Sequence, residues 1–185
     1  MDEDQKKRLW GWFDEHRSSK NINDPNFILR AFQETGVDYN FEVLNELIER
    51  YYKYSGLFSI PKNLHILISK ILPQTSVSVL APYAGIGLLP LGISKKKSNT
   101  NFDLIISNHN DKLIAEKILP ANSNILFGDQ LDCIDKSKKR YDAVVSLLPF
   151  GLRSNTTQIN SLQYDDPAIL GELKKFALQD YGLAI

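Results

Sequence analysis

The sequence predicts an α/β protein in which a helical N-terminal segment precedes a parallel sheet with helices on both faces. Two observations predict this class. Through residues 1–74, apolar side chains recur at the spacing of amphipathic helices, and from residue 75 short apolar strands alternate with helical or loop segments. Apolar strands that alternate with helices are typical of parallel sheets that are covered on both faces. We therefore expect a helical N-terminal subdomain over residues 1–74 and an α/β domain over residues 75–185.

Four helical segments are expected in the N-terminal subdomain. The first covers residues 4–19 and the second covers residues 27–32, which Gly36 ends. Asn40 can cap the third helix, and Pro61 fits the first turn of the fourth. The apolar stripes of the first, third and fourth helices are Leu9, Trp10 and Phe13; Phe41, Leu44, Leu47, Ile48 and Tyr51; and Leu64, Leu67, Ile68 and Ile71. Because most aromatic side chains lie on these stripes, we expect them to pack helices rather than to stack on bases.

Four strands are expected after residue 75, and a fifth is expected to start near the end of the chain. The strands read SVSVLAP, FDLIISN, SNILFGD and YDAVVSLLP, from residues 76, 102, 123 and 141. The segments between them are expected to form helices over residues 88–97, 111–119 and 130–139, followed by a helix over residues 167–178. The last five residues, YGLAI, can open a fifth strand. Because the pattern stops there, we expect the chain to be part of a longer protein with a truncated sheet.

Charge and composition exclude several classes of protein. The chain has 22 basic and 22 acidic residues, so no overall field attracts nucleic acid or an anionic membrane. Its single cysteine, Cys133, excludes an internal disulfide and a Cys-rich metal site. The charged N-terminus does not resemble a signal peptide, and no apolar run approaches the roughly 20 residues of a membrane span. We expect a cytoplasmic protein without a membrane partner.

The ends of the strands are where a ligand would bind. Open parallel sheets bind ligands beyond the carboxyl ends of their strands. After the first strand, Gly85 and Gly87 form a turn that leads to a helix, and such glycines allow backbone amides to approach a ligand. A dinucleotide fingerprint would place a third glycine where Pro90 stands, which argues against NAD. A turn that needs glycine for its geometry alone is the alternative.

Four stretches, taken in order, carry a resemblance to a known family. They read GLFSIPKNLHILISKIL from residue 56, LAPYAGIGLL from residue 80, LFGDQL from residue 126 and VVSLLPFG from residue 144. This arrangement resembles the S-adenosylmethionine-dependent DNA adenine methyltransferases, and is most similar to the N-6 DNA methylases of type I restriction-modification systems. The resemblance implies a Rossmann-like methyltransferase fold, S-adenosylmethionine as cofactor, and DNA or other protein subunits as partners of the full-length protein.

The resemblance also implies which positions would hold the cofactor. These are Phe58, Pro61, Ala81, Pro82, Gly85, Gly87, Asn108 and Asp129. Asp129, next to Gly128, matches the aspartate that contacts the cofactor adenine in the family. Ala81 stands where the family has a carboxylate, and Asn108 stands where it has the acid that binds the ribose. Asn108 can still bond a hydroxyl, but without the charge-assisted geometry of a carboxylate.

The family's target-base loop, which reads N-P-P-F or N-P-P-Y, aligns with Leu147, Leu148, Pro149 and Phe150. Methylation of an exocyclic amine needs acceptors that orient the amine and relieve its developing positive charge. Leu147, on the asparagine position, offers neither donor nor acceptor, and strand alternation predicts that Ser146 points to the opposite face. We therefore expect that this loop does not catalyse adenine methylation. Phe150 can stack on a base or pack against the protein.

Two hypotheses for function follow. In the first, the chain is a DNA adenine methyltransferase-like domain of a longer protein that retains cofactor binding around Gly85, Gly87, Asn108 and Asp129 but is catalytically impaired. In the second, it is a methyltransferase-derived scaffold or interaction module, a pseudoenzyme that no longer binds the cofactor. Departures from the family pattern at three separate positions favour loss of activity.

No metal site is expected, because the three histidines and Cys133 lack the spacing of metal ligands. We expect His65, within a helix, to be a structural histidine with its ring nitrogens satisfied. His109 follows the second strand, where it either contacts a nucleoside or has no ligand. The basic runs at residues 95–97 and 136–140 are expected to be solvated helix ends rather than a DNA-binding patch.

Overall fold

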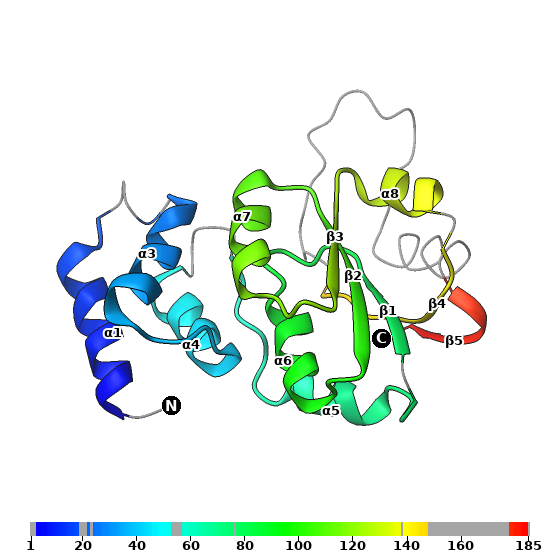
Figure 1. Cartoon of the computed structure of the whole chain (residues 1–185), viewed down its shortest axis with the longest axis horizontal. Helices are drawn as coiled ribbons and strands as arrows, with labels where there is room; N and C mark the ends of the chain where they lie inside the picture. The colour runs from blue at the N-terminus through cyan, green and yellow to red at the C-terminus, as the bar shows by residue number, and fades with distance from the viewer. Residues whose placement is uncertain are drawn as a thin grey trace.

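The computed structural model describes residues 3–18, 22, 24–52, 57–75, 77–137, 139–147 and 178–184. It shows helices in the first part of the chain and alternating strands and helices after residue 76 (Figure 1). In chain order the elements are α1 (Glu3–His16), α3 (Pro25–Thr35), α4 (Phe41–Tyr51), α5 (Leu64–Ile71), β1 (Val77–Ala81), α6 (Leu88–Lys96), β2 (Thr100–Ile106), α7 (His109–Ile118), β3 (Ser123–Phe127), α8 (Gln130–Ser137), β4 (Tyr141–Val144) and β5 (Leu178–Ala184).

The five strands form one parallel sheet in the order β3-β2-β1-β4-β5. The chain moves outward from β1 to β3 and then returns past β1 to β4. As a result α6 and α7 cover one face and α8 covers the other (Figure 1). The predicted parallel α/β sheet is therefore confirmed. The reversal of direction between β1 and β4 opens a crevice at their carboxyl ends, which is where sheets of this kind bind ligands.

Alternating residues of the central strands supply the two sides of the core. Val79 and Leu104 pack in the larger cluster with residues of α6 and α7. Leu80 and Ile105, their neighbours along the strands, pack in a smaller cluster with Ile134 of α8. This alternation follows from the pleat of a β-strand, and burial of both faces explains why the strands are apolar throughout.

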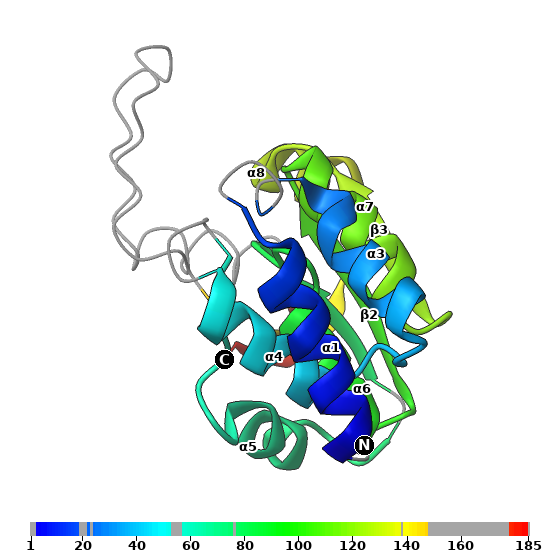
Figure 2. The same ribbon diagram turned by 90° about the vertical axis from the view of Figure 1, so that its left-hand side faces the viewer.

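The N-terminal helices form a further layer over α6 and α7, and Figure 2 shows α1, α3 and α4 in front of them. Their buried side chains belong to the same cluster as those of the sheet. Aromatic pairs hold the layer together, since the Phe13 ring lies 5.1 Å from both the Phe27 and Tyr51 rings. The packing role expected for these aromatics is confirmed. The boundary at residues 74 and 75 stays a prediction.

Two helix caps were correctly predicted from the sequence. The Asn40 side chain accepts a hydrogen bond from the Glu42 amide at 2.9 Å, at the start of α4. Gly36 ends α3 in the left-handed conformation, with φ of 65°, which glycine adopts without strain. These residues fix where α3 stops and α4 begins.

Other boundaries differ from the predictions. The helix α5 starts at Leu64 rather than at Pro61, because Asn63 adopts φ of 67° and separates Pro61 from the helix by a turn. The strand β4 ends at Val144, five residues before the predicted end. The fifth strand begins at Leu178, ahead of the predicted start, and pairs with β4. The helix predicted over residues 167–178 otherwise lies outside the described residues.

The basic run at residues 95–97 is part of the helix packing. The Lys97 side chain is buried, and its Nζ donates a hydrogen bond to the Leu72 carbonyl oxygen at 3.2 Å. Lys95 pairs with Glu42 of α4 at 3.4 Å. The expectation of a solvated helix end is therefore wrong for Lys97.

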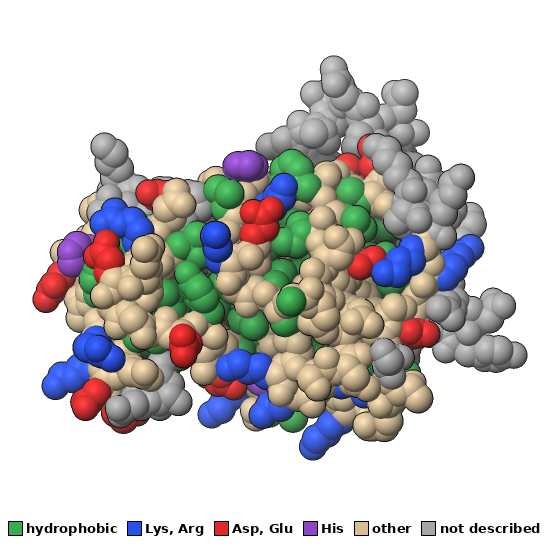
Figure 3. Space-filling view, viewed as in Figure 1, with side chains coloured by type: hydrophobic (Ala, Val, Ile, Leu, Met, Phe, Trp, Pro, Cys, Tyr) green, Lys and Arg blue, Asp and Glu red, His purple; other side chains and the backbone are tan. Residues whose placement is uncertain are grey.

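Over the face drawn in Figure 3, Lys and Arg side chains are interspersed with Asp and Glu. In the part of the chain that the structure describes, no helix has the length and apolar character needed to cross a bilayer.

Candidate functional site

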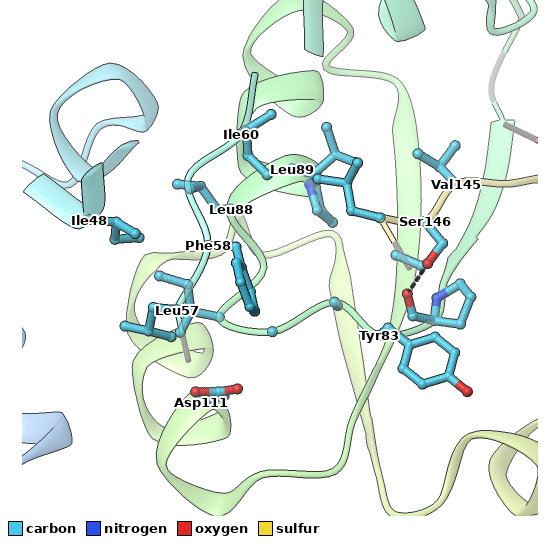
Figure 4. A pocket seen from close by; sticks show the side chains of 17 residues that line it. Ile48, Leu57, Phe58, Ile60, Tyr83, Leu88, Leu89, Asp111, Val145 and Ser146 are labelled. Atoms are coloured by element: carbon cyan, nitrogen blue, oxygen red, sulfur yellow. Dashed lines mark hydrogen bonds between the residues drawn. The ribbon is translucent and has the colours of Figure 1, made fainter. Parts of the chain in front are cut away.

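A cavity of about 90 Å³ lies at the carboxyl ends of β1 and β4 (Figure 4). The turn after β1 forms its floor, the segment before α5 closes one side, and the residues after β4 close the other. Its lining includes five of the positions singled out from the sequence, together with apolar residues of α4 and α6. The residues singled out from the sequence are Phe58, Ala81, Pro82, Gly85 and Leu147.

The glycine turn uses its two glycines for different reasons. Gly85 has φ of 53°, and a Cβ added there would meet nothing within 4 Å, so the backbone conformation alone requires glycine. Gly87 has φ of 80°, and a Cβ there would lie 2.9 Å from Cδ2 of Leu119 and 3.1 Å from Cδ2 of Leu104. Gly87 is buried and is not among the residues that line the cavity. It therefore permits close packing between the turn and α7.

The turn is held by side chains from two other strand ends. The Tyr83 amide donates to Oε1 of the buried Gln130, at the start of α8, at 2.9 Å. The Ser146 hydroxyl donates to the Pro82 carbonyl oxygen at 2.8 Å. Ser146 lines the cavity, so the expectation that it points to the opposite face is wrong. Because β4 ends at Val144, strand alternation does not extend to Ser146.

Asn108 acts as a helix cap. Its side-chain oxygen accepts hydrogen bonds from the amides of Asn110 at 2.8 Å and Asp111 at 3.3 Å, at the start of α7. This is why α7 begins at His109, two residues before the predicted start. The oxygen that was expected to accept a ribose hydroxyl is therefore engaged by the backbone, and Asn108 is not among the cavity-lining residues.

Asp129 has a similar role at the start of α8. Its Oδ1 accepts a hydrogen bond from the Asp132 amide at 3.2 Å. The preceding Gly128 has φ of 150° and donates its amide to the Ile106 carbonyl oxygen at 3.1 Å. The Asp129 side chain is exposed and lies outside the set of cavity-lining residues.

The segment before α5 presents Phe58 to the cavity. The Asn45 carboxamide of α4 bonds both the amide and the carbonyl oxygen of Ile60, which fixes the chain two residues after Phe58. The Phe58 ring lines the cavity and is 70% exposed. Pro61 is exposed and is not among the lining residues. The structure therefore does not bring this predicted cofactor-binding position to the cavity.

Leu147 is half-buried, lines the cavity and packs against the main core. Its neighbour Val145 is buried and donates its amide to the Leu80 carbonyl oxygen at 2.9 Å. The side of the cavity formed by Leu147 is therefore apolar. Leu148, Pro149 and Phe150, the remainder of the predicted loop, lie outside the described residues.

Asp111 lines the cavity, although the sequence predicted only that it lies in a helix. It lies in the first turn of α7, and its carboxylate lies near Leu57 and Phe58 (Figure 4). Burial raises the pKa of the Asp111 carboxyl above its ordinary value. Among the described residues it is the carboxylate that lines this cavity. Asp111 lines the same cavity as Leu57 and Phe58, some fifty positions earlier in the chain, which no local pattern indicates.

Of the histidines, His65 is buried between three helices. Its ring lies 4.1 Å from the Phe41 ring, and its Nδ1 has no hydrogen-bond partner in the described part of the chain. The structural role of His65 is as expected, but the expectation that both of its ring nitrogens have hydrogen-bond partners is wrong. Burial lowers the pKa of His65; Glu42 acts against this shift, while Lys96 and Lys95 add to it.

His109 begins α7, its ring meets the Phe127 ring edge-on at 6.1 Å, and it is not among the cavity-lining residues. In the described ranges, no group of three or more His, Cys, Asp or Glu side chains is arranged to hold a metal ion.

No family model and no curated protein matches the sequence. Solved structures match the fold. The methyltransferase subunit of a type I restriction-modification system from Streptococcus thermophilus is 15% identical; the match covers 85% of this chain and 42% of that chain, with a TM-score of 0.57. A structure assigned as an O-methyltransferase from Klebsiella pneumoniae is 9% identical; the match covers 74% of this chain and 60% of that chain, with a TM-score of 0.52.

At these identities the likeness establishes the fold alone. The chain has an α/β Rossmann-like methyltransferase fold, and it spans less than two thirds of either structure.

The residues described at this edge of the sheet do not fit the S-adenosylmethionine that such a fold implies. Ala81 is buried and apolar, and the oxygen of Asn108 is used by the helix cap. The cavity, at about 90 Å³, is also smaller than the roughly 300 Å³ at the lower end of small-molecule sites. The glycine turn is present, but Asn108 is engaged by its helix cap and Asp129 lies outside the cavity-lining residues, which leaves Asp111 as the carboxylate among the described lining residues.

Proposed function

We propose that this chain is a methyltransferase-derived domain of a longer protein, related to the N-6 DNA methylases, that does not methylate adenine. The observation that carries the proposal is Leu147 at the carboxyl end of β4. Its side chain lines the cavity and packs on the core, where an amide would be needed to accept hydrogen bonds from a target amine.

Neighbouring polar groups do not supply the missing acceptor. The Ser146 hydroxyl, the nearest one along the chain, donates to the Pro82 carbonyl oxygen and so holds β4 against the turn after β1. The hydroxyl oxygen keeps its acceptor lone pairs, but the bond to the Pro82 carbonyl oxygen fixes the Ser146 side chain one residue before the position that aligns with the family's amide. Ser146 therefore stabilises the site but does not replace the amide.

We infer that cofactor binding is lost as well, which makes the domain a non-catalytic scaffold or interaction module. The engaged oxygen of Asn108 and the small cavity support this second hypothesis over retention of S-adenosylmethionine. The similarity to a type I methyltransferase subunit supports DNA or other protein subunits as partners of the full-length protein, in the cytoplasm.

Two experiments on the full-length protein test the proposal. In the first, adenine-containing DNA and S-adenosylmethionine are supplied, and transfer of labelled methyl groups is measured; we expect none above background. The double variant Leu147→Asn with Leu148→Pro then asks whether the loop alone causes the loss. Methylation by the unaltered protein would overturn the proposal.

The second experiment is calorimetry with S-adenosylmethionine. We expect no saturable heat. Micromolar binding that Asp129→Ala weakens would overturn the loss of cofactor binding, but it would leave the predicted absence of methylation standing.

A further inference from the structure

Asp111 presents a carboxylate to the cavity. Its backbone amide binds Asn108, but in the described ranges its side chain makes no hydrogen bond or ion pair. The adjacent Lys112 does not neutralise it, because Lys112 pairs with Glu116 along the helix at 3.6 Å. Among the residues that the structure describes, the Asp111 carboxylate therefore has no counter-charge.

The surroundings of the Asp111 carboxyl disfavour its charged form. Asp111 is half-buried, and loss of hydration raises the pKa of its carboxyl. A buried carboxylate is stable when an opposite charge or hydrogen-bond donors approach it. The first turn of α7 offers part of this stabilisation through the helix dipole. The helix dipole does not explain why the Asp111 side chain also lines the cavity.

The surface beside Asp111 suits an organic cation. Leu57 and Phe58 lie next to it in the cavity wall, and the Phe58 ring is 70% exposed (Figure 4). Exposed aromatic faces attract ammonium groups that carry alkyl substituents, and a nearby carboxylate adds a direct charge interaction. An anionic ligand would be repelled by Asp111. A neutral ligand would leave the carboxylate uncompensated.

We propose that this cavity binds a small alkylammonium group, with Asp111 as counter-charge and Phe58 as the apolar and π-electron surface. The cavity volume of about 90 Å³ leaves room for a small group such as a substituted ammonium head. This proposal does not depend on the proposed absence of methylation, because Asp111 and Phe58 carry it, while Leu147 supplies only part of the apolar wall of the same cavity.

The test is a titration of the ¹⁵N-labelled chain, followed by its amide NMR signals. The probes are choline and 3,3-dimethyl-1-butanol, in which carbon replaces the charged nitrogen at nearly the same size. We expect choline to produce saturable shifts at Leu57, Phe58, Gly85 and Asp111. The neutral probe should bind at least roughly fivefold more weakly.

Variants locate the charge that is responsible. Asp111→Asn should weaken choline binding by at least roughly fivefold and remove the preference for choline over the neutral probe. Asp38→Asn is the matched control, because Asp38 is exposed in the loop before α4, is not among the cavity-lining residues, and its replacement removes the same charge. It should leave choline binding unchanged.

A direct titration of the Asp111 carboxyl carbon gives an independent readout. Saturating choline should lower the pKa of this carboxyl, since the cation stabilises its ionised form. Equal binding of the two probes, an unaffected Asp111→Asn variant with a native-like spectrum, or no saturable shift with choline would each overturn the proposal. A carboxyl that serves only the helix dipole would give the last result.

Discussion

Gly92→Ala tests how tightly the N-terminal helices pack on α6. Gly92 lies inside α6, where a Cβ would be 2.7 Å from Cδ2 of Phe41 and 3.0 Å from Cβ of His65. Carbon atoms pack best at roughly 3.5–4.0 Å, so the added methyl is about 1 Å too close to a ring that is itself buried. Both neighbours, Phe41 of α4 and His65 of α5, are buried.

Two opposing effects set the magnitude. Alanine favours the helix over glycine by about 1 kcal/mol, whereas overpacking of a core costs about 1–3 kcal/mol. We expect the second effect to win, and Gly92→Ala to lower the free energy of unfolding by about 1 kcal/mol. Gly11→Ala is the matched control, because Gly11 lies inside α1 with nothing within 4 Å of an added Cβ. It should raise the same quantity by about 1 kcal/mol.

Urea unfolding, followed by circular dichroism, measures both variants against the unaltered chain. The double variant Gly92→Ala with Phe41→Leu, compared with each single variant in a mutant cycle, should show favourable coupling because the smaller side chain makes room. If Gly92→Ala stabilises the chain as much as Gly11→Ala does, the close packing of α6 on α4 and α5 is refuted.

Three further predictions concern polar groups. Burial holds the pKa of His65 below about 6.5, so the unfolded chain binds the extra proton more readily than the folded chain does. The free energy of unfolding should therefore fall as the pH drops below 6.5. In urea titrations, His65→Gln should flatten that dependence on pH. Asn108→Ala should cost about 1 kcal/mol of stability while Asn108→Asp costs little, since both Asn and Asp cap helices; equal losses would argue against the cap. Tyr141→Phe removes a 2.7 Å hydrogen bond to the buried Asp103 and should cost about 1–2 kcal/mol by thermal unfolding, and an unchanged midpoint would contradict this role.

The sheet was predictable because a strand that is buried on both faces is apolar at consecutive positions, a pattern that is visible in the local sequence. Strands such as Val77–Ala81 and Thr100–Ile106 are apolar over consecutive positions, and the helices between them are apolar at helical spacing. Their order in the sheet, β3-β2-β1-β4-β5, comes from the structure, because the crossover rules for parallel strands limit the possible orders without selecting one. The glycine turn was also predictable, because two glycines between a strand and a helix are seldom placed there without a geometric reason.

The roles of single polar residues were less predictable. Asn108 at the end of a strand suits a ligand contact and a helix cap equally well, and only the positions of the Asn110 and Asp111 amides decide between them. Ser146 was misplaced because strand alternation was carried past Val144, where β4 ends. Asp111 became a cavity residue through tertiary contact with a distant segment, which leaves no local pattern.

The hydrogen bonds that hold the turn after β1 have a consequence for the order in which the chain folds. Tyr83 is bonded to a residue 47 positions later, and Pro82 to one 64 positions later. During synthesis, the turn is made before Gln130 and Ser146, the residues that hold it. We therefore expect the glycine turn to gain its last hydrogen bonds only after the chain through Ser146 has been made and β4 has joined β1.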